Sequence, residues 1–235
     1  ASINLLMALM LVGVALAGKP QVRIAVPALA VVFLALFVTR NPDIYPEMYA
    51  NLFKDHTLLW HEEGIENTVS VFRHPEGYKI MYLDSREHAY DHPAPVRYHQ
   101  LIGSLGMIVH PDPKDVLVIG LGGGATPGAV VPFKDSNVDV VELSPSVVRA
   151  AIDNFGAVNN DIGHQKNAHI MVDDGRNYLM LTKKKYDVIT ADIIQPIHAG
   201  SANLYSREYF ELAKSALKPG GVMVQWINPG LTQIY

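Results

Sequence analysis

The sequence predicts a doubly wound α/β fold with a parallel β-sheet, preceded by a small β-rich region. Two observations lead to this prediction. Short apolar strands alternate with helical segments through the second half of the chain, as expected for a parallel sheet with right-handed crossovers. In addition, Val116–Ala125 forms an apolar strand with a glycine-rich turn, and a second apolar strand, Val138–Glu142, ends in an acid.

The length and charge of the chain limit its function. Its 235 residues suffice for one full-sized domain plus a small additional element. The formal net charge of −4 argues against a broad nucleic-acid-binding surface, so we expect no nucleic-acid partner. The absence of cysteine excludes disulfides and Cys-ligated zinc.

Residues 1–40 predict a transmembrane helical hairpin. Two uncharged runs, Ile3–Ala17 and Ile24–Thr39, flank the basic turn Gly18–Arg23. The two runs have 15 and 16 residues, at the short end for crossing a hydrocarbon core of about 30 Å. A signal peptide is the alternative, because Ala15-Leu-Ala17 resembles a cleavage site, but the first run lacks a basic n-region. We therefore expect a membrane-anchored protein and leave open the side of the membrane on which its large domain lies.

Two short regions are expected between the anchor and the parallel sheet. Residues 41–62 contain prolines and turn formers, which predict a linker. Residues 63–110 form the β-hairpin region, in which Thr68–Phe72 and Tyr78–Leu83 alternate apolar and polar side chains around a Pro-Glu-Gly turn. The apolar spacing of Val96–Val109 predicts a helix at the end of this region.

Residues 111–235 predict the α/β domain itself. Ser144 is suited to cap a helix that begins at Pro145, because its hydroxyl can accept from a free backbone N–H. The predicted strands are 115–120, 138–143, 168–174, 186–192 and 222–227, and the predicted helices start near 126, 144, 176 and 206.

The glycine-rich turn predicts a nucleoside-binding site. Gly120, Gly122 and Gly124 tolerate positive φ, and Glu142, about 20 residues later, is placed to accept hydrogen bonds from ribose hydroxyls. Ala125 breaks the strict pyrophosphate fingerprint, and no Lys-Ser or Lys-Thr pair follows to make a P-loop. A nucleoside without a long phosphate chain, such as S-adenosylmethionine, fits better.

The stretch from about Glu63 to Ile227 resembles the spermidine synthase family of polyamine aminopropyltransferases, and especially its membrane-attached relatives. The resemblance implies a methyltransferase-type Rossmann fold. Seven segments in family order carry it: Tyr98–Gln100, Val116–Ala125, Val140–Leu143, Asp173–Gly175, Tyr186–Asp192, Leu204–Phe210 and Leu217–Gly221.

The resemblance also implies roles for individual residues. The three glycines of the turn would face S-adenosylmethionine or its decarboxylated form, and Glu142 would hold the ribose. Asp174 would accept from the adenine amino group, and Asp192 would lie beside the amine substrate. The structural alternatives are turn chemistry for Asp174, which precedes Gly175, and a solvated strand end for Glu142.

One loop departs from the family pattern. Family members carry Asp-Ser-Ser-Asp-Pro after the fourth strand, whereas this chain has Asp192-Ile-Ile-Gln-Pro196, so Gln195 replaces the acid that helps to deprotonate the amine. A neutral amide cannot accept that proton near pH 7, and general-base catalysis typically contributes about 10²–10⁴-fold. The sequence therefore predicts a degenerate active site that transfers poorly to polyamines.

The end of the chain and its histidines complete the sequence-based predictions. Sheets of this type usually add two more strands, so we expect the domain to be truncated after the fifth strand and its open edge to be covered by a partner.

His88, Asp91 and His92 have ligand-like spacing without a second cluster, and His61-Glu-Glu63 lacks a second histidine. We therefore expect no metal.

Two functional classes remain open. The first is a non-catalytic accessory subunit of a larger membrane complex, with no cofactor or a weakly bound one. The alternative is a transferase that uses S-adenosylmethionine or its decarboxylated form on an amine. The replacement of the family acid by Gln195 and the expected absence of the last two strands favour the accessory subunit. The sequence alone does not decide whether the protein is an enzyme.

Overall fold

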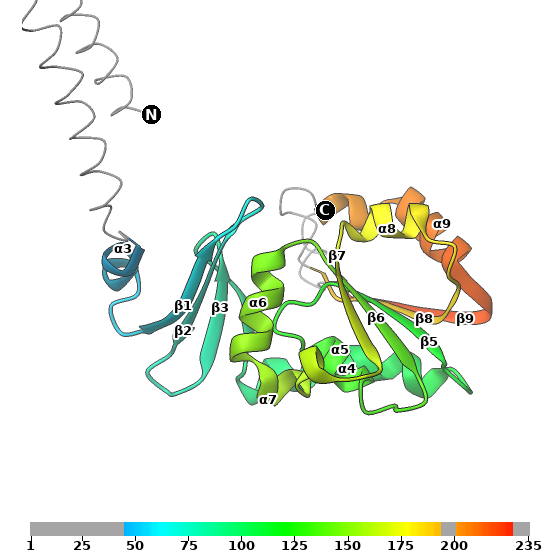
Figure 1. Ribbon diagram of the computed structural model, residues 1–235, viewed down its shortest axis with the longest axis horizontal. Helices are drawn as coiled ribbons and strands as arrows, with labels where there is room; N and C mark the ends of the chain where they lie inside the picture. Colours follow the sequence, from blue (N-terminus) through cyan, green and yellow to red (C-terminus); the bar gives the residue numbers. More distant parts are fainter. Residues whose placement is uncertain (1–44, 194–200, 228–235) are drawn as a thin grey trace, which may run out of the picture. The chain divides into compact units, whose positions relative to one another are not determined.

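The computed structural model describes residues 45–193 and 201–227. Residues 1–52 and 53–235 separate into two compact units, and the described part of the first is the helix α3, Tyr45–Leu52. The second unit contains two sheets of four and five strands (Figure 1). α3 and the first strand, β1, both lie in the segment where the sequence suggested only a linker.

The four-stranded sheet is antiparallel, in the order β1-β2-β3-β4. The predicted hairpin is present as β2 and β3, and its turn contains Gly77, whose φ of +95° favours glycine. The sequence analysis missed the two outer strands. The strands are β1 Thr57–Glu63, β2 Thr68–Arg73, β3 Lys79–Leu83 and β4 Arg86–Tyr90.

The five-stranded sheet is parallel, in the order β7-β6-β5-β8-β9, as the alternation of strands and helices predicts. Its strands are β5 Asp115–Ile119, β6 Asn137–Glu142, β7 Ala168–Val172, β8 Tyr186–Ala191 and β9 Leu217–Gln225. Its helices are α4 Pro93–Val109, α5 Ala125–Val130, α6 Pro145–Asn154, α7 Gly156–Asn159, α8 Gly175–Leu181 and α9 Arg207–Ala216, with the 3₁₀ turns η1 Ile162–His164 and η2 Ser201–Tyr205.

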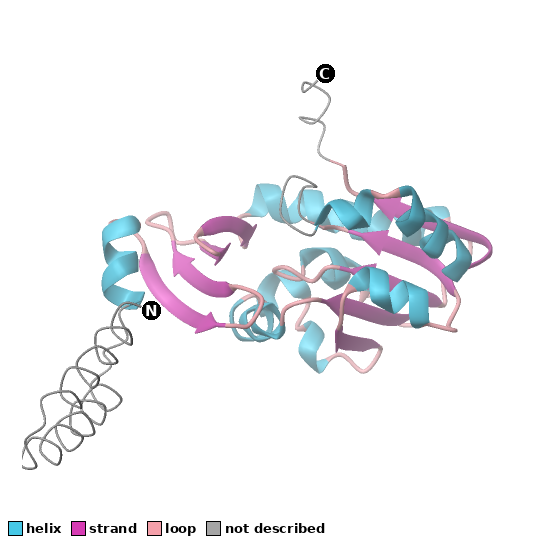
Figure 2. Ribbon diagram, turned by 90° about the horizontal axis from the view of Figure 1, so that it is seen from above, coloured by secondary structure: helices cyan, strands magenta, loops and turns pink. Residues whose placement is uncertain are grey.

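The helices form two layers around the parallel sheet. α4 and α5 lie on one side, and α8 and α9 lie on the other (Figure 1). Figure 2 shows the same helices and strands from above. The helix starts follow the expected capping chemistry, since the side chains of Ser144 and Ser206 accept from the backbone N–H three residues later. A doubly wound sheet covered on both faces is the result.

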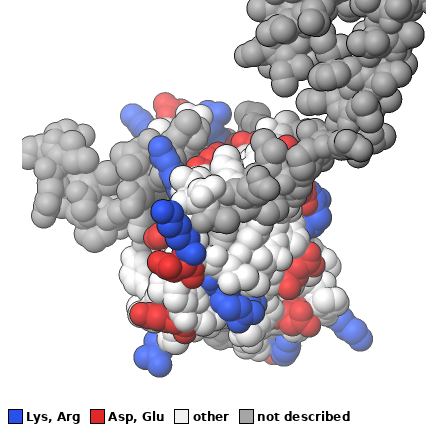
Figure 3. Space-filling model, turned by 90° about the vertical axis from the view of Figure 1, so that its left-hand side faces the viewer, with Lys and Arg blue, Asp and Glu red and all other residues white. Residues whose placement is uncertain are grey.

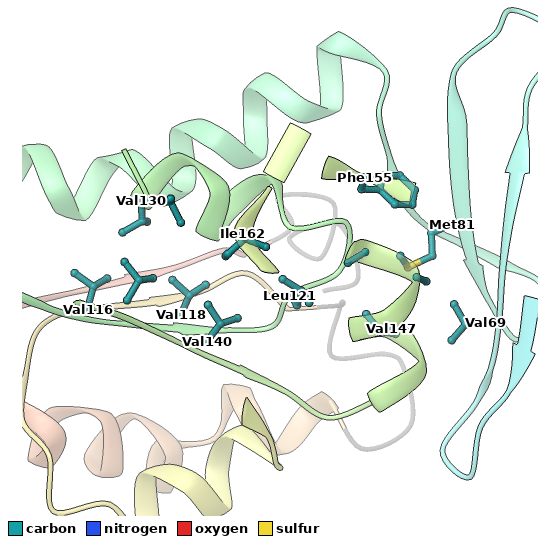
Figure 4. Packing of buried hydrophobic residues seen from close by; sticks show 14 of the residues in the cluster. Val69, Met81, Val116, Val118, Leu121, Val130, Val140, Val147, Phe155 and Ile162 are labelled. Carbon is teal, nitrogen blue, oxygen red and sulfur yellow. The ribbon is translucent and has the colours of Figure 1, made fainter. Parts of the chain in front are cut away.

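Buried apolar side chains join the small sheet to the large one. Val69 and Met81 of the small sheet point toward Val147 of α6 and toward Phe155 (Figure 4). Beside this core, Glu62 of β1 accepts hydrogen bonds from Ser146 and Arg149 of α6. The small sheet is therefore docked on the α/β layer by both packing and polar contacts.

The fifth strand begins earlier than predicted. β9 starts at Leu217. Tyr186 pairs with Leu217 and Val188 pairs with Val222, so the predicted turn Lys218–Gly221 forms a bulge between these two pairs. Gly220, with φ +81°, permits this bulge. Residues 228–235 lie outside the described residues, so truncation beyond β9 stays a prediction.

Within the two described ranges, no helix is long and apolar enough to cross a membrane. The longest, α4, has 17 residues and buries one face in the protein. At 1.5 Å per residue it reaches about 26 Å, less than a hydrocarbon core of about 30 Å. This finding corrects the prediction of a membrane-anchored protein; the two apolar runs behind that prediction lie outside the described residues.

Charges of both signs are interspersed on the face shown in Figure 3. Blue and red side chains lie next to one another between larger areas of uncharged surface, and neither sign gathers into a broad patch among the described residues visible there. Such a face does not create the single-sign field that attracts polyanions.

An ionic network closes the amino-terminal edge of the parallel sheet. The Lys218 ammonium donates to Asp115 at 2.6 Å and to Asp187 at 2.9 Å. On the next strand, Asp139 accepts from Lys184 at 2.8 Å and from the Tyr186 hydroxyl at 2.7 Å. These charges are partly or fully buried and hydrogen-bonded, so removal of one partner would leave the other as an uncompensated buried charge.

This edge predicts a pH-dependent stability. Burial would raise the pKa of Asp187, but hydrogen bonds from the amides of Asp115 and Lys114 and from Lys218 outweigh it and hold the pKa below its usual value. A lowered folded-state pKa means that the carboxylate stabilises the fold above its unfolded pKa of about 3.9, and that this contribution is lost as the pH falls through the folded pKa.

We expect Asp187→Asn to lower the free energy of unfolding at pH 7 by about 1.5 kcal/mol, because hydrogen bonds to a charged acceptor are lost. The difference from the unsubstituted protein should shrink as the pH falls from about 5 to about 2. Urea unfolding at each pH measures it. A difference that stays constant over this range would show that the Asp187 charge does not contribute.

Candidate functional site

The functional residues predicted from the sequence gather at the carboxyl edge of the parallel sheet. β6 follows β5 on one side, whereas β8 lies on the other side, so the direction of winding reverses between β5 and β8. In open α/β sheets, ligands bind in the crevice at this switch point. The glycine-rich loop leaves β5 there, and Asp192 follows β8.

A pocket of about 240 Å³ opens at the switch point. Five segments line it, including the small sheet, which contributes the strand β4. The lining residues are Glu87, His88, Ala89, Tyr90, His99, Leu121, Gly122, Gly123, Gly124, Ala125, Thr126, Asp192, Ile193 and Trp226. The site thus depends on both sheets being docked together.

The three glycines adopt the backbone conformation for which the sequence suggested them. Gly120, Gly122 and Gly124 have φ values of +91°, +53° and +84°. At Gly120 a side chain would also collide with the protein, because a Cβ there would lie 2.6 Å from the carbonyl oxygen of Asp192. The loop after β5 and the start of the loop after β8 therefore approach each other more closely than any other residue allows.

Asp192 is the most tightly held acid of the pocket. Its Oδ2 lies 2.6 Å from His99 Nδ1 and accepts a hydrogen bond from the Thr126 hydroxyl. The side chain of Asp192 is 11% exposed, and that of His99 is 35% exposed. A carboxylate positioned by two partners and facing a pocket is suited to accept a proton or to bind a cation.

The Thr126 hydroxyl connects both partners of this pair. Its Oγ1 lies 3.1 Å from the His99 carbonyl oxygen as well as beside Asp192, and its single proton can be donated to one of them at a time. The charged carboxylate is the stronger acceptor. Thr126 thereby ties the start of α5 to both α4 and the end of β8.

Glu142 binds the protein itself. Its two carboxylate oxygens accept from the amides of Leu121, at 2.8 Å, and Ser144, at 3.0 Å. Desolvation raises the pKa of Glu142, and the backbone hydrogen bonds, including that from Ser144, act in the opposite direction. Glu142 thus clamps the glycine loop to the start of α6, and binding of a ribose at this residue stays a prediction.

Asp174 caps a helix. Its Oδ1 accepts from the backbone N–H of Asn177 at 2.8 Å, so Asp174 is the N-cap of α8, and its predicted bond to an adenine amino group stays a prediction. Neither Asp174 nor Glu142 lines the pocket, whereas Gly122, Gly124 and Asp192 do. The predicted site residues therefore share one sheet edge but divide between the pocket and the ends of β6 and β7.

The sequence analysis missed several residues of the site. His99 lies in the quoted segment Tyr98–Gln100, but its pairing with Asp192 over 93 residues had no signal in the sequence. Trp226, at the end of β9, was also missed. Behind the loop, the buried Asn159 side chain donates to the Ala151 carbonyl oxygen. A Cβ added at Gly124 would lie 2.6 Å from the Cβ of Asn159.

The histidines with ligand-like spacing have separate positions. His92 caps α4 through Nδ1, and Asp91 accepts from the Lys79 amide at 2.5 Å, while His88 lines the pocket. Across the part of the chain that the structure describes, no group of three or more His, Asp or Glu residues could hold a metal ion. Gln195, on which the predicted degeneracy of the site rests, lies outside the described residues.

Comparisons with known proteins agree with this architecture. The model of the spermine/spermidine synthase domain matches residues 96–230. Two spermidine synthase structures share the fold, and each match covers 71% of this chain. One, in complex with the transition-state analogue AdoDATO, has a TM-score of 0.65, 24% identity and 57% of its own length covered. The other, from Thermotoga maritima, has a TM-score of 0.61, 23% identity and 55% covered.

Two sequence relatives are named polyamine aminopropyltransferase. The polyamine aminopropyltransferase of Methanocaldococcus jannaschii is 36% identical over 129 residues, which cover 54% of this chain and 43% of the relative. That of Escherichia fergusonii is 28% identical over 182 residues, which cover 76% of this chain and 62% of the relative. The chain thus spans about half of the length of the relatives it matches.

Proposed function

The chain belongs to the spermine/spermidine synthase family, and from this membership we propose that it is a transferase that moves an aminopropyl group from decarboxylated S-adenosylmethionine to an amine. The observation that carries the proposal is the Asp192 carboxylate, held by His99 and Thr126 in a pocket beside the glycine loop. This proposal takes up the alternative from the sequence analysis, because the relatives are named as aminopropyltransferases. No observation supports the accessory subunit of a membrane complex.

The proposed reaction is a displacement at carbon. The amine nitrogen attacks the aminopropyl carbon bonded to the sulfonium sulfur, the carbon–sulfur bond breaks, and its electrons stay on sulfur to give a neutral thioether, methylthioadenosine. The attacking amine loses one proton, which Asp192 accepts. His99 and Thr126 position this carboxylate. A positioned general base of this kind typically contributes about 10²–10⁴-fold.

Residues at the ends of β6 and β7 suit the nucleoside of the donor. Leu143 and Val172 are exposed apolar side chains close in sequence to Glu142 and Asp174, and they offer an apolar surface for a planar base. Each carboxylate already accepts backbone hydrogen bonds. A carboxylate has about four lone-pair sites, so it can accept a further bond from a ribose hydroxyl or an adenine amino group.

The pocket suits a cationic acceptor. Glu87 and Asp192 supply two carboxylates, and Tyr90 and Trp226 supply aromatic rings among the lining residues. Carboxylates and aromatic faces both attract ammonium groups. We therefore propose a primary amine with a second positive charge, such as putrescine, as the acceptor.

The test combines binding with turnover. Calorimetry with decarboxylated S-adenosylmethionine measures donor binding, and release of methylthioadenosine with and without putrescine measures transfer. We expect binding and amine-dependent release, which the replacement Gln195→Asp should accelerate by restoring the acid of the family pattern. If both the unsubstituted protein and Gln195→Asp bind the donor but release no methylthioadenosine in response to the amine, the transferase proposal is wrong and a non-catalytic role is favoured.

A further inference from the structure

Four consecutive residues of the small sheet, Glu87–Tyr90, line the pocket. In a regular strand successive side chains point to opposite faces, so only alternate residues reach one side. β4 departs from this rule through a bulge, because Glu87 and Ala89 pair with consecutive residues of β3 and leave His88 as an additional residue. Bulges beside binding sites re-aim side chains. This one brings Glu87 to the same pocket as His88.

The Glu87 carboxylate is held by a tyrosine of the same strand. Its Oε2 accepts a hydrogen bond from the Tyr90 hydroxyl at 2.5 Å. Burial, and then this hydrogen bond, raise the pKa of Tyr90 above its usual value, so the hydroxyl keeps its proton and donates it to Glu87. A carboxylate has about four lone-pair sites on its two oxygens. Glu87 is therefore oriented by Tyr90 and can still accept from a ligand.

No cation of the described protein neutralises Glu87. Within residues 45–193 and 201–227, no Lys, Arg or His forms an ion pair with it, and the pocket lining contains neither Lys nor Arg. By contrast, Glu62 of the same sheet is paired with Arg149. The Glu87 charge also contributes, after burial, to raising the pKa of Tyr82 to about 12. An oriented carboxylate of this kind suits a cation that the ligand supplies.

The two carboxylates of the pocket come from different sheets and suit different ends of one acceptor. Asp192 follows β8 and accepts the proton of the attacking nitrogen in the proposed transfer. Because that nitrogen lies at Asp192, the group that meets Glu87 is the far end of the acceptor. We propose that Glu87 selects the acceptor by binding the ammonium group at its far end, with Tyr90 as the positioning residue. This inference rests on the proposed transferase and names the residue that decides which amine it uses.

Putrescine and butylamine separate selection from chemistry. Both have a primary amine on the same carbon chain, but butylamine lacks the far ammonium. We expect Glu87→Gln to raise the KM for putrescine about tenfold, because a hydrogen bond to a charged group is lost. Its kcat, and the use of butylamine, should stay unchanged. The amide keeps the shape of the side chain and can still accept from Tyr90. Release of methylthioadenosine measures both amines.

Two further variants and a control sharpen this comparison. Glu87→Arg should make 4-aminobutyrate a better acceptor than putrescine, since the favoured far group is now a carboxylate. Tyr90→Phe should raise the KM for putrescine about threefold, because Glu87 loses its orientation but keeps its charge. The matched control is Glu63→Gln, at an exposed carboxylate of β1 outside the pocket, which should leave both amines unchanged.

Calorimetry with putrescine and with butylamine tests Glu87 without turnover. Putrescine binding that is about tenfold weaker in Glu87→Gln, with butylamine binding unchanged, supports selection by Glu87. Equal losses for the two amines would show that Glu87 only holds β4 in place, and no loss for either would place it outside the acceptor site; both results overturn the proposal. If the unsubstituted protein binds putrescine through Glu87 but releases no methylthioadenosine with any amine, the transferase alone is contradicted.

Discussion

Asp192→Asn should reduce aminopropyl transfer by about 10²–10⁴-fold while leaving donor binding nearly unchanged. The substitution keeps the shape of the side chain and can still bond Thr126 or His99, but an amide cannot accept the amine proton. The rate of methylthioadenosine release at saturating amine measures the chemical step, and calorimetry measures the affinity for the donor.

The control for this substitution is Asp161→Asn, at an exposed carboxylate outside the pocket, which should leave the rate unchanged. Removal of the positioning group by His99→Gln should lower the transfer rate less than removal of the acid does, because the Thr126 hydroxyl still bonds the carboxylate. A loss smaller than about threefold in Asp192→Asn would assign the base to another residue.

Gly103→Ala should lower the free energy of unfolding by about 3 kcal/mol, because the new methyl group overlaps a backbone atom. Its Cβ would lie 2.1 Å from the carbonyl oxygen of Thr126, so α4 and α5 must move apart. The helix propensity of alanine returns only about 1 kcal/mol of this loss. Since Thr126 also binds Asp192, transfer should weaken together with stability.

Ser104→Ala is the matched control in the same helix. Ser104 donates to the Gln100 carbonyl oxygen within α4, so its replacement should change the stability by less than about 0.5 kcal/mol. Urea unfolding of both variants gives the comparison. If the two variants unfold at the same urea concentration, α4 and α5 can separate without cost and the close approach is not a determinant of the fold.

Local patterns in the chain were enough to predict the parallel sheet. Most strands of this sheet contain a short apolar run, and the side chains of Ser144 and Ser206 mark helix starts through hydrogen bonds that span three residues. The small sheet was predicted less well. β4, Arg86–Tyr90, has two charged residues and no apolar alternation, so it is held by pairing with β3 rather than by its own pattern.

The site divides in the same way. The sequence by itself determined the glycine loop, Glu142 at the end of β6 and Asp192 directly after β8. Glycines that permit positive φ and apolar runs that end in an acid are local patterns, which short stretches of sequence show. Only the tertiary structure decided that His99 and Thr126 hold Asp192, and that Glu142 clamps the loop amide of Leu121. These hydrogen bonds join residues 21 to 93 positions apart, and they form only after α4, α5 and the strands have packed, since packing sets which polar groups meet.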